Sequence, residues 1–276
     1  MAELTDWVGR VREQEDEIGR PALRRIAAML DIGGLDLAPG AAVPTHWYAM
    51  FFPEIAAQAE LGEDGHPRRG DFLPPVALPR RMFAGRRVWF DGALRVGDLA
   101  VKRSEVVAVT PKRGRSGEMV FVTVAHRVSV GGRVVVREEQ DVVYRAAAVP
   151  GAAAGVPMAA PLADWSQALR PTTTLLFRYS AVTWNGHRIH YDADYARGVE
   201  GYSGLVMNGG LSLLLLMQAV SARLGQAPTA VAVRNLMPVL VDTELRLEGT
   251  EVADGRARAW VRDARGGLAV MAELEF

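Results

Sequence analysis

The chain has 276 residues, which fits one large domain or two domains of about 130 residues. Lys and Arg balance Asp and Glu at 32 each, and this zero net charge excludes the basic footprint of a nucleic-acid-binding protein. A composition of 49% apolar and 23% charged residues is that of a folded globular protein. The absence of cysteine excludes a disulfide scaffold, a thiolate metal site and a cysteine nucleophile.

The N-terminal residues, Met1–Glu17, are charged from the third residue onward and lack the apolar run of a secretory signal. The most apolar stretch of the chain, Leu211–Val220, is about half as long as a bilayer-spanning helix. We therefore expect a soluble, cytoplasmic protein that binds neither membranes nor nucleic acid.

One uncharged segment, Ala146–Ala163, consists mainly of Ala, Pro and Gly. Such a segment has little to bury, and its prolines resist regular structure, so we interpret it as a linker. It separates an N-terminal domain, residues 1–145, from a C-terminal domain, residues 164–276.

Both parts end in several predicted strands with alternating or continuous apolar residues. The predicted strands are Arg87–Phe90, Asp98–Val109, Met119–Val130 and Arg133–Tyr144 in the first part, and Ala230–Val233, Thr243–Val252, Arg256–Arg262 and Leu268–Phe276 in the second. The segments Phe90–Val106 and Leu240–Val252 look like copies of one unit. The order of elements predicts a duplicated α+β domain, each half having one antiparallel sheet and one main helix.

The main helix of the second part is predicted from Asn208 as N-cap, through Leu211–Leu224, to Gly225 just beyond its C-terminus. Because the helix is apolar on every side, we expect it to be buried on every side. A sheet that curves around the helix would bury it in this way.

The segment just before this helix, Val182–Asp194, is rich in chemically active side chains. They are Asn185, His187, Arg188, His190, Tyr191, Asp192 and Asp194. The pair His187 and His190 could bind a metal, but the sequence has no clear third ligand at the usual spacing and no HExxH pattern. Alternatively, the segment could be a polar surface loop with no chemical role. We favour acid–base chemistry, since histidine titrates near neutral pH.

The residues leading into the helix, Gly201–Gly210, include four glycines. Glycines allow close approach to the backbone, and the free amides of a helix N-terminus can stabilise an oxyanion such as a thioester enolate. The alternative is that these glycines only allow tight packing at the start of the helix.

At this point several longer motifs resemble a known family. Arg178–Gly210 resembles the MaoC-like and type-2 hydroxyacyl-thioester dehydratases, and more closely the two-domain mesaconyl-C4-CoA hydratase group. The N-terminal motifs that are similar to the same group are Thr45–Pro53, Asp64–Gly92, Lys112–His126 and Glu138–Arg145. The resemblance covers nearly the whole chain and implies an α+β double hotdog: two fused hotdog domains, each a curved antiparallel sheet around a long helix.

The resemblance also implies the reaction, a reversible syn hydration of a 2-enoyl-CoA. In the MaoC pattern an Asp and a His five residues apart handle the water and the proton. His190 occupies the His position and Asn185 the Asp position, so His190 would move the proton while Asn185 orients the water. His187 stands where the pattern has Asn, and Asp192 is a second-choice carboxylate. The backbone amide of Gly209 would bind the oxyanion.

The N-terminal part has no matching histidine motif, since Ala22–Phe52 offers only Asp31 and His46 at unrelated spacing. We therefore expect this part to shape the pocket. Candidate substrate-binding residues are His46, Trp47, Arg80, Arg81, His187, Arg188 and Arg234. The arginines are candidates for the free carboxylate of a dicarboxylyl substrate. Coenzyme A would belong to the substrate, with no separate cofactor and no metal.

The substrate implied by the resemblance is a C5 dicarboxylyl-CoA, either itaconyl-CoA or mesaconyl-C4-CoA, with citramalyl-CoA as the product. One alternative is a (3R)-hydroxyacyl-thioester dehydratase of general acyl metabolism. Others are a non-catalytic acyl-CoA-binding hotdog protein and a thioesterase that uses Asp192 or Asp194. Two fused hotdogs allow a monomer or a homodimer.

Overall fold

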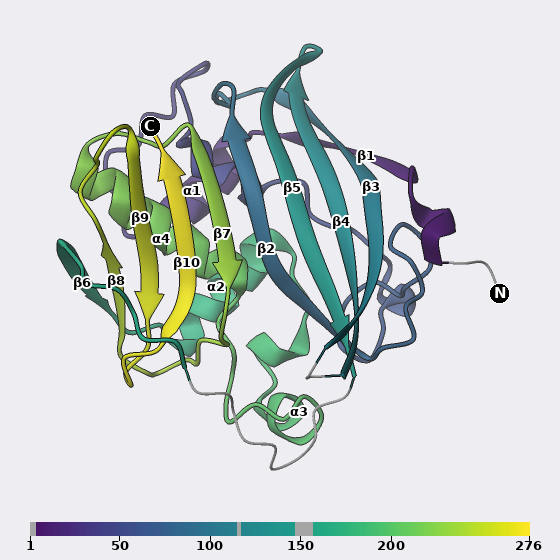
Figure 1. The fold of residues 1–276 in the computed structure, drawn as a ribbon. Coiled ribbons are helices and arrows are strands. Elements are labelled where there is room, and N and C mark those ends of the chain that lie inside the picture. The colour runs from purple at the N-terminus through teal and green to yellow at the C-terminus, as the bar shows by residue number, and fades with distance from the viewer. Residues whose placement is uncertain (1–3, 115–116, 147–156) are drawn as a thin grey trace.

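The computed structural model describes residues 4–114, 117–146 and 157–276 (Figure 1). In this part of the chain ten strands form one antiparallel sheet in the order β1-β3-β4-β5-β2-β7-β10-β9-β8-β6. The N-terminal strands are β1 (Val11–Glu17), β2 (Arg80–Phe90), β3 (Leu99–Gly114), β4 (Gly117–Val130) and β5 (Arg133–Arg145). The C-terminal strands are β6 (Trp165–Leu169), β7 (Ala230–Asn235), β8 (Leu245–Gly249), β9 (Arg256–Arg262) and β10 (Leu268–Glu275).

The two halves of the sheet meet where β2 pairs with β7, from Gly85 opposite Arg234 to Trp89 opposite Ala230. A side chain at Gly85 would place its Cβ 2.3 Å from the carbonyl oxygen of Val233, so glycine is needed for the strands to approach here. All strands up to residue 145 lie on one side of this junction and all later strands on the other. The domain boundaries stay a prediction, and most of the expected linker, residues 147–156, lies outside the described residues.

The helices of the described chain lie mainly behind the sheet in the view of Figure 1. The α-helices are α1 (Arg20–Met29), α2 (Thr173–Thr183), α3 (Ala193–Gly198) and α4 (Gly209–Leu224), and the 3-10 helices are η1 (Leu4–Trp7), η2 (Thr45–Met50), η3 (Gln58–Glu60) and η4 (Arg188–His190). No helix in the described ranges is both long and apolar enough to cross a membrane.

Helix α4 confirms the prediction of a buried helix. It starts after Asn208, ends at Gly225 in the left-handed conformation, and packs against the C-terminal half of the sheet. The side chain of Asn208 makes no capping hydrogen bond, although the sequence favoured that role.

The N-terminal half differs from the expectation of a long helix in each half. Helix α1 has only ten residues, and the chain leaves it through Asp31, which has a φ of 54°. The strands β3, β4 and β5 extend well beyond α1. Part of their inner face packs on the segment 72–78 instead, in a second apolar cluster with Val106, Val122 and Tyr144. Another part of this face is open to a cleft.

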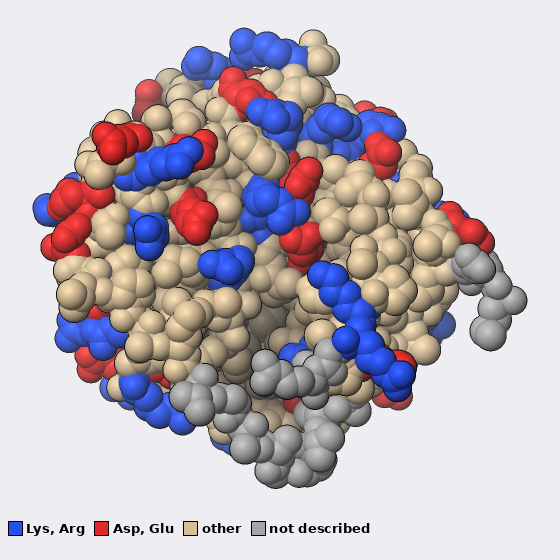
Figure 2. Space-filling model, viewed as in Figure 1, with Lys and Arg blue, Asp and Glu red and all other residues tan. Residues whose placement is uncertain are grey.

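The outward face of the sheet carries interspersed positive and negative side chains (Figure 2). Arg87, for example, forms ion pairs with Glu139 and Asp141 on the neighbouring strand. This face therefore shows no large basic patch, in keeping with the zero net charge.

Candidate active site

A cleft of about 1030 Å³ is lined by residues from both halves of the chain. Its C-terminal wall includes residues 185–191 and the start of α4, residues 207–210. Its N-terminal wall includes residues 61–63 and 65–67 and the uncovered inner face of β3, β4 and β5. The segment that sequence analysis favoured for chemistry thus faces a cavity, opposite residues of the N-terminal half.

His190 is held with one nitrogen directed at the protein. Helix α2 ends at Trp184 in the left-handed conformation, and the following turn leads into η4, which carries His190. The Nδ1 atom of His190 lies 2.6 Å from the carbonyl oxygen of Val206. A carbonyl only accepts hydrogen bonds, so Nδ1 carries the hydrogen and Nε2 keeps a free lone pair. Burial lowers the pKa of His190 to about 4, which keeps the ring neutral and available as a base.

Asn185 lies on the same turn and lines the cleft. Its Oδ1 accepts a hydrogen bond of 2.9 Å from the backbone N–H of His187, which fixes the turn. A carboxamide does not titrate at neutral pH. Asn185 is therefore suited to orienting a ligand and not to moving a proton.

Helix α4 begins at the cleft with Gly209 and Gly210. A Cβ at Gly209 would lie 2.9 Å from the Phe83 ring, and one at Gly210 would lie 2.2 Å from the Tyr179 hydroxyl. Tight packing thus requires both glycines. The first amides of a helix also have no partner within the helix, so they remain available to a developing negative charge.

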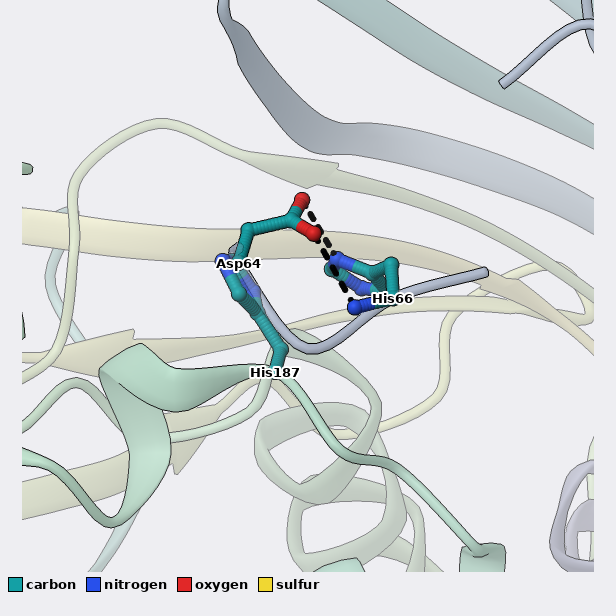
Figure 3. Close-up of side chains that lie close together, drawn as sticks. All are labelled: Asp64, His66 and His187. Atoms are coloured by element: carbon teal, nitrogen blue, oxygen red, sulfur yellow. Dashed lines mark hydrogen bonds and ion pairs between the residues drawn. The ribbon is translucent and has the colours of Figure 1, made fainter. Parts of the chain in front are cut away.

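A loop of the N-terminal half brings Asp64 and His66 to the same site (Figure 3). The backbone N–H of Arg188 donates to the carbonyl oxygen of Asp64 at 2.9 Å. Gly65 lies so close to Gly186 that a Cβ would fall 1.9 Å from the Gly186 oxygen. The two loops therefore meet backbone to backbone, which only glycine at this position allows.

The imidazole rings of His66, His187 and His190 form a row. The ring centres of His66 and His187 are 4.2 Å apart, and those of His187 and His190 are 5.3 Å apart. The Asp64 carboxylate binds the Nδ1 atom of His66 at 3.0 Å. Burial, and next the charge of His66, hold the pKa of His187 far below its usual value, so this ring is neutral.

Asp64, His66 and His187 each offer one donor atom, and the three atoms lie within 4.8 Å of one another. Three such donors could meet a cation. Asp64 and His66, however, already satisfy each other through the hydrogen bond between them. The arrangement is accounted for as a carboxylate–imidazole pair, and the expected absence of a metal stays a prediction.

Sequence analysis missed the roles of Asp64 and His66. They stand in a quoted motif, Asp64–Gly92, but Asp-Gly-His is too short to signal a site. Nothing in local spacing shows that this loop meets His187, more than a hundred residues later in the chain.

The predicted substrate-binding residues are divided between the cleft and other places. Arg81, His187 and Arg188 line the cleft. Trp47 is fully buried in the main core, and His46 borders a separate small cavity, where its Nε2 lies 3.3 Å from Oε1 of Gln218. Neither residue lines the cleft.

The predicted arginines differ in whether a carboxylate already neutralises them. Arg80 pairs with Glu200 at 3.0 Å, and Arg188 pairs with Asp192 at 2.7 Å. Arg234 is exposed on β7, away from the cleft. Arg81 lines the cleft and makes no ion pair within the described ranges, so it is the predicted arginine best placed for a substrate carboxylate.

The N-terminal wall also contains cations that sequence analysis missed. Arg12 pairs with Glu54 at 2.7 Å and Arg86 pairs with Glu138 at 3.3 Å. Lys102 forms no ion pair in the described part of the chain, and donates only a long hydrogen bond of 3.4 Å to the carbonyl oxygen of Phe52. Burial lowers its pKa to about 8. Lys102 and Arg81 thus line the cleft without an ion pair in the described part of the chain. Glu54 and Glu138 act on the charge of Lys102 only at longer range. Glu54 and Asp64 act on that of Arg81 in the same way.

Comparison with known proteins agrees with this geometry. The model of the family "Hydroxyacyl-thioester dehydratase type 2" matches residues 45–241. The chain is 37% identical over 250 residues to a mesaconyl-C(4)-CoA hydratase of Chloroflexus aurantiacus, covering 89% of this chain and 88% of the relative. It is 36% identical over 69 residues to the mitochondrial hydroxyacyl-thioester dehydratase type 2 of Saccharomyces cerevisiae, covering 25% of each chain.

Solved structures share the fold at low sequence identity. HtdX of Mycobacterium tuberculosis superposes with a TM-score of 0.69 at 20% identity, covering 96% of this chain and 99% of that one. A second M. tuberculosis protein, described as having a double hotdog fold, superposes with a TM-score of 0.57 at 15% identity and covers 97% and 95% of the two chains. These structures confirm the predicted double hotdog. The family model and the long match to a hydratase show that the chain belongs to the hydroxyacyl-thioester dehydratase type 2 family, and it is a hydro-lyase.

Proposed function

We propose that the protein catalyses the reversible hydration of a 2-enoyl-CoA, with His190 as the base. The observation that carries the proposal is the buried, neutral imidazole of His190. Its Nδ1 is held by the protein, which leaves Nε2 free, and the residue lines the same cleft as the start of α4. The long match to a hydratase supports the same reaction.

In this reaction Nε2 of His190 removes a proton from water as the water oxygen bonds to the β-carbon. The π electrons of the double bond move toward the thioester oxygen, which gains negative charge. The backbone amide of Gly209 stabilises this charge, because it is a preorganised donor at a helix N-terminus. Asn185 orients the water through its amide. Delivery of a proton to the α-carbon then completes the addition.

We further propose that the acyl group carries a free carboxylate, as in the C5 dicarboxylyl thioesters mesaconyl-C4-CoA and itaconyl-CoA, with citramalyl-CoA as product. The cleft supports this proposal, because Lys102 and Arg81 line it and neither forms an ion pair within the described residues. An ordinary apolar acyl chain would leave these half-buried charges without a direct partner, which is unfavourable.

The test is to follow loss of the enoyl-thioester absorbance with the purified protein and no added metal. Mesaconyl-C4-CoA, itaconyl-CoA and crotonyl-CoA are compared at equal concentration. Faster hydration of either C5 substrate than of crotonyl-CoA supports the proposal and ranks the two. A preference for crotonyl-CoA would contradict the dicarboxylyl substrate and favour general acyl metabolism. No turnover of any of the three, with binding retained, would contradict the proposed hydration.

A further inference from the structure

Hydration of the double bond requires two proton transfers, one from water and one to the α-carbon. His190 accounts for the first transfer. Asn185 cannot carry out the second, because a carboxamide is neither an acid nor a base near neutral pH. The His187 ring makes no hydrogen bond in the described part of the chain, and its pKa is far too low for it to hold a proton. His66 is the remaining imidazole of the row.

The geometry of His66 resembles that of His190. The Asp64 carboxylate accepts hydrogen bonds from both the backbone N–H and the ring Nδ1 of His66, each at 3.0 Å (Figure 3). A carboxylate only accepts, so Nδ1 carries a hydrogen and the chemistry of the ring is left to Nε2. His66 lines the cleft, whereas Asp64 lies behind it.

The two imidazoles differ in what holds them. His190 is fixed by a neutral carbonyl, and His66 is fixed by a carboxylate, which stabilises a protonated ring. Burial lowers the pKa of His66, and the charge of Arg81 acts in the same sense. Asp64 and Glu54 oppose this shift, because both carboxylates favour the imidazolium. The His187 and His190 rings lie beyond His66 in the row. Burial lowers the pKa of both rings, His66 and His190, and only His66 has a carboxylate on its Nδ1 atom to stabilise the protonated form.

We propose that His66, positioned by Asp64, is the second proton-transfer group of this site and supplies the proton of the α-carbon. The inference rests on the proposed hydration. As His190 takes a proton from water and the carbon–oxygen bond forms, the electron pair of the double bond moves to the enolate. The His66 imidazolium then gives its Nε2 proton to the α-carbon, and the thioester carbonyl re-forms. His190 releases its proton to water and His66 regains one from water, so that the enzyme is restored.

In the dehydration direction neutral His66 removes the α-proton and protonated His190 assists departure of the hydroxyl group. The N-terminal half would then contribute a catalytic residue as well as the wall of the pocket. Asp64 is a positioning residue in this scheme, since it acts through His66.

The test compares His66→Gln and Asp64→Asn with Asp71→Asn, which changes an exposed carboxylate farther along the same loop that does not line the cleft. Hydration of mesaconyl-C4-CoA is measured across pH, and exchange of the product's α-proton is followed in deuterium oxide. We expect His66→Gln to lower kcat and α-proton exchange by ~100-fold with little change in KM. Asp64→Asn should lower kcat by about 10-fold and shift the alkaline limb of kcat/KM to lower pH, because the imidazolium loses its carboxylate. Asp71→Asn should match the wild type.

Wild-type kcat and an unmoved alkaline limb in Asp64→Asn would overturn the role of this pair. The proposed hydration with His190 as the base would still stand if His190→Ala had lost activity. If Asp64→Asn does not fold, His66→Gln decides, because it leaves Asp64 in place. Activity that is lost with a chelator and restored by Zn²⁺ would assign the three side chains to a metal and overturn the proposal. No hydration by the wild type would refute both proposals together.

Discussion

Replacement of Lys102 by Met tests how the cleft recognises its substrate. Met keeps most of the length of the side chain and removes its charge. A hydrogen bond to a charged group contributes ~1.5–3 kcal/mol, so kcat/KM for a dicarboxylyl-CoA should fall by about 10- to 150-fold. Crotonyl-CoA has no free carboxylate and therefore makes no such contact with Lys102. The kcat/KM of the variant for crotonyl-CoA should remain within about threefold of the wild-type value.

The control is Lys112→Met, since Lys112 is the other lysine of the chain and lies exposed on the same strand, β3. Initial rates at several concentrations give kcat/KM for mesaconyl-C4-CoA, itaconyl-CoA and crotonyl-CoA. Equal losses on the C5 substrates and crotonyl-CoA would refute the argument, because Lys102 would then act on folding or on coenzyme A. A loss of kcat/KM in Lys112→Met as large as that in Lys102→Met would also refute the argument.

Three further predictions concern stability. The pKa of Lys102 is about 8 in the folded chain, against 10.5 for an unperturbed lysine, so the unfolded state binds the extra proton between these pH values. Lys102→Met should therefore raise the free energy of unfolding by on the order of 3 kcal/mol at pH 7, and denaturant titrations should show this gain vanishing as pH rises from 8 to 10.5. Three buried histidines have a pKa of about 4 in the folded protein, against 6.5 for an unperturbed histidine: His46, His126 and His190. The unfolded state therefore binds more protons as pH falls, and the free energy of unfolding should fall steeply between pH 6.5 and pH 4. A constant Tm over that range would contradict the burial of these rings in the neutral form. Gly85→Ala should lower Tm by several degrees, since its Cβ would lie 2.3 Å from the Val233 oxygen where the two halves pair; an unchanged Tm would mean that the junction can shift.

The sequence predicts the parts of the fold that depend on local pattern. Helix α4 is recognisable because a continuous apolar stretch ends at a glycine, and the structure places its end at Gly225. Strands β9 and β10 are predicted within a residue, because alternating side chains and glycine turns mark them. Strands β1 and β6 were missed, because edge strands such as Val11–Glu17 bury no side chain fully and have no apolar pattern.

The site was only partly predictable for the same reason. His190 and Asn185 lie in one short segment, and their spacing suggests chemistry without knowledge of the fold. The pairing of Asp64 and His66 with His187 depends on contact between loops of two different halves, which no local pattern encodes. Lys102 resembles an ordinary strand residue in the sequence, and its importance follows only from the shortness of α1, which leaves that face of β3 open to the cleft.

The most direct test of the central claim is the hydration rate of His190→Ala on the best of the three enoyl-CoA substrates. Near-ultraviolet circular dichroism and binding of the same substrate show whether the variant is folded. We predict that kcat falls by at least ~100-fold while substrate binding changes little, because the variant loses the base that deprotonates water. A folded His190→Ala protein that hydrates the substrate at a rate near that of the wild type would contradict the assignment of His190 as the base.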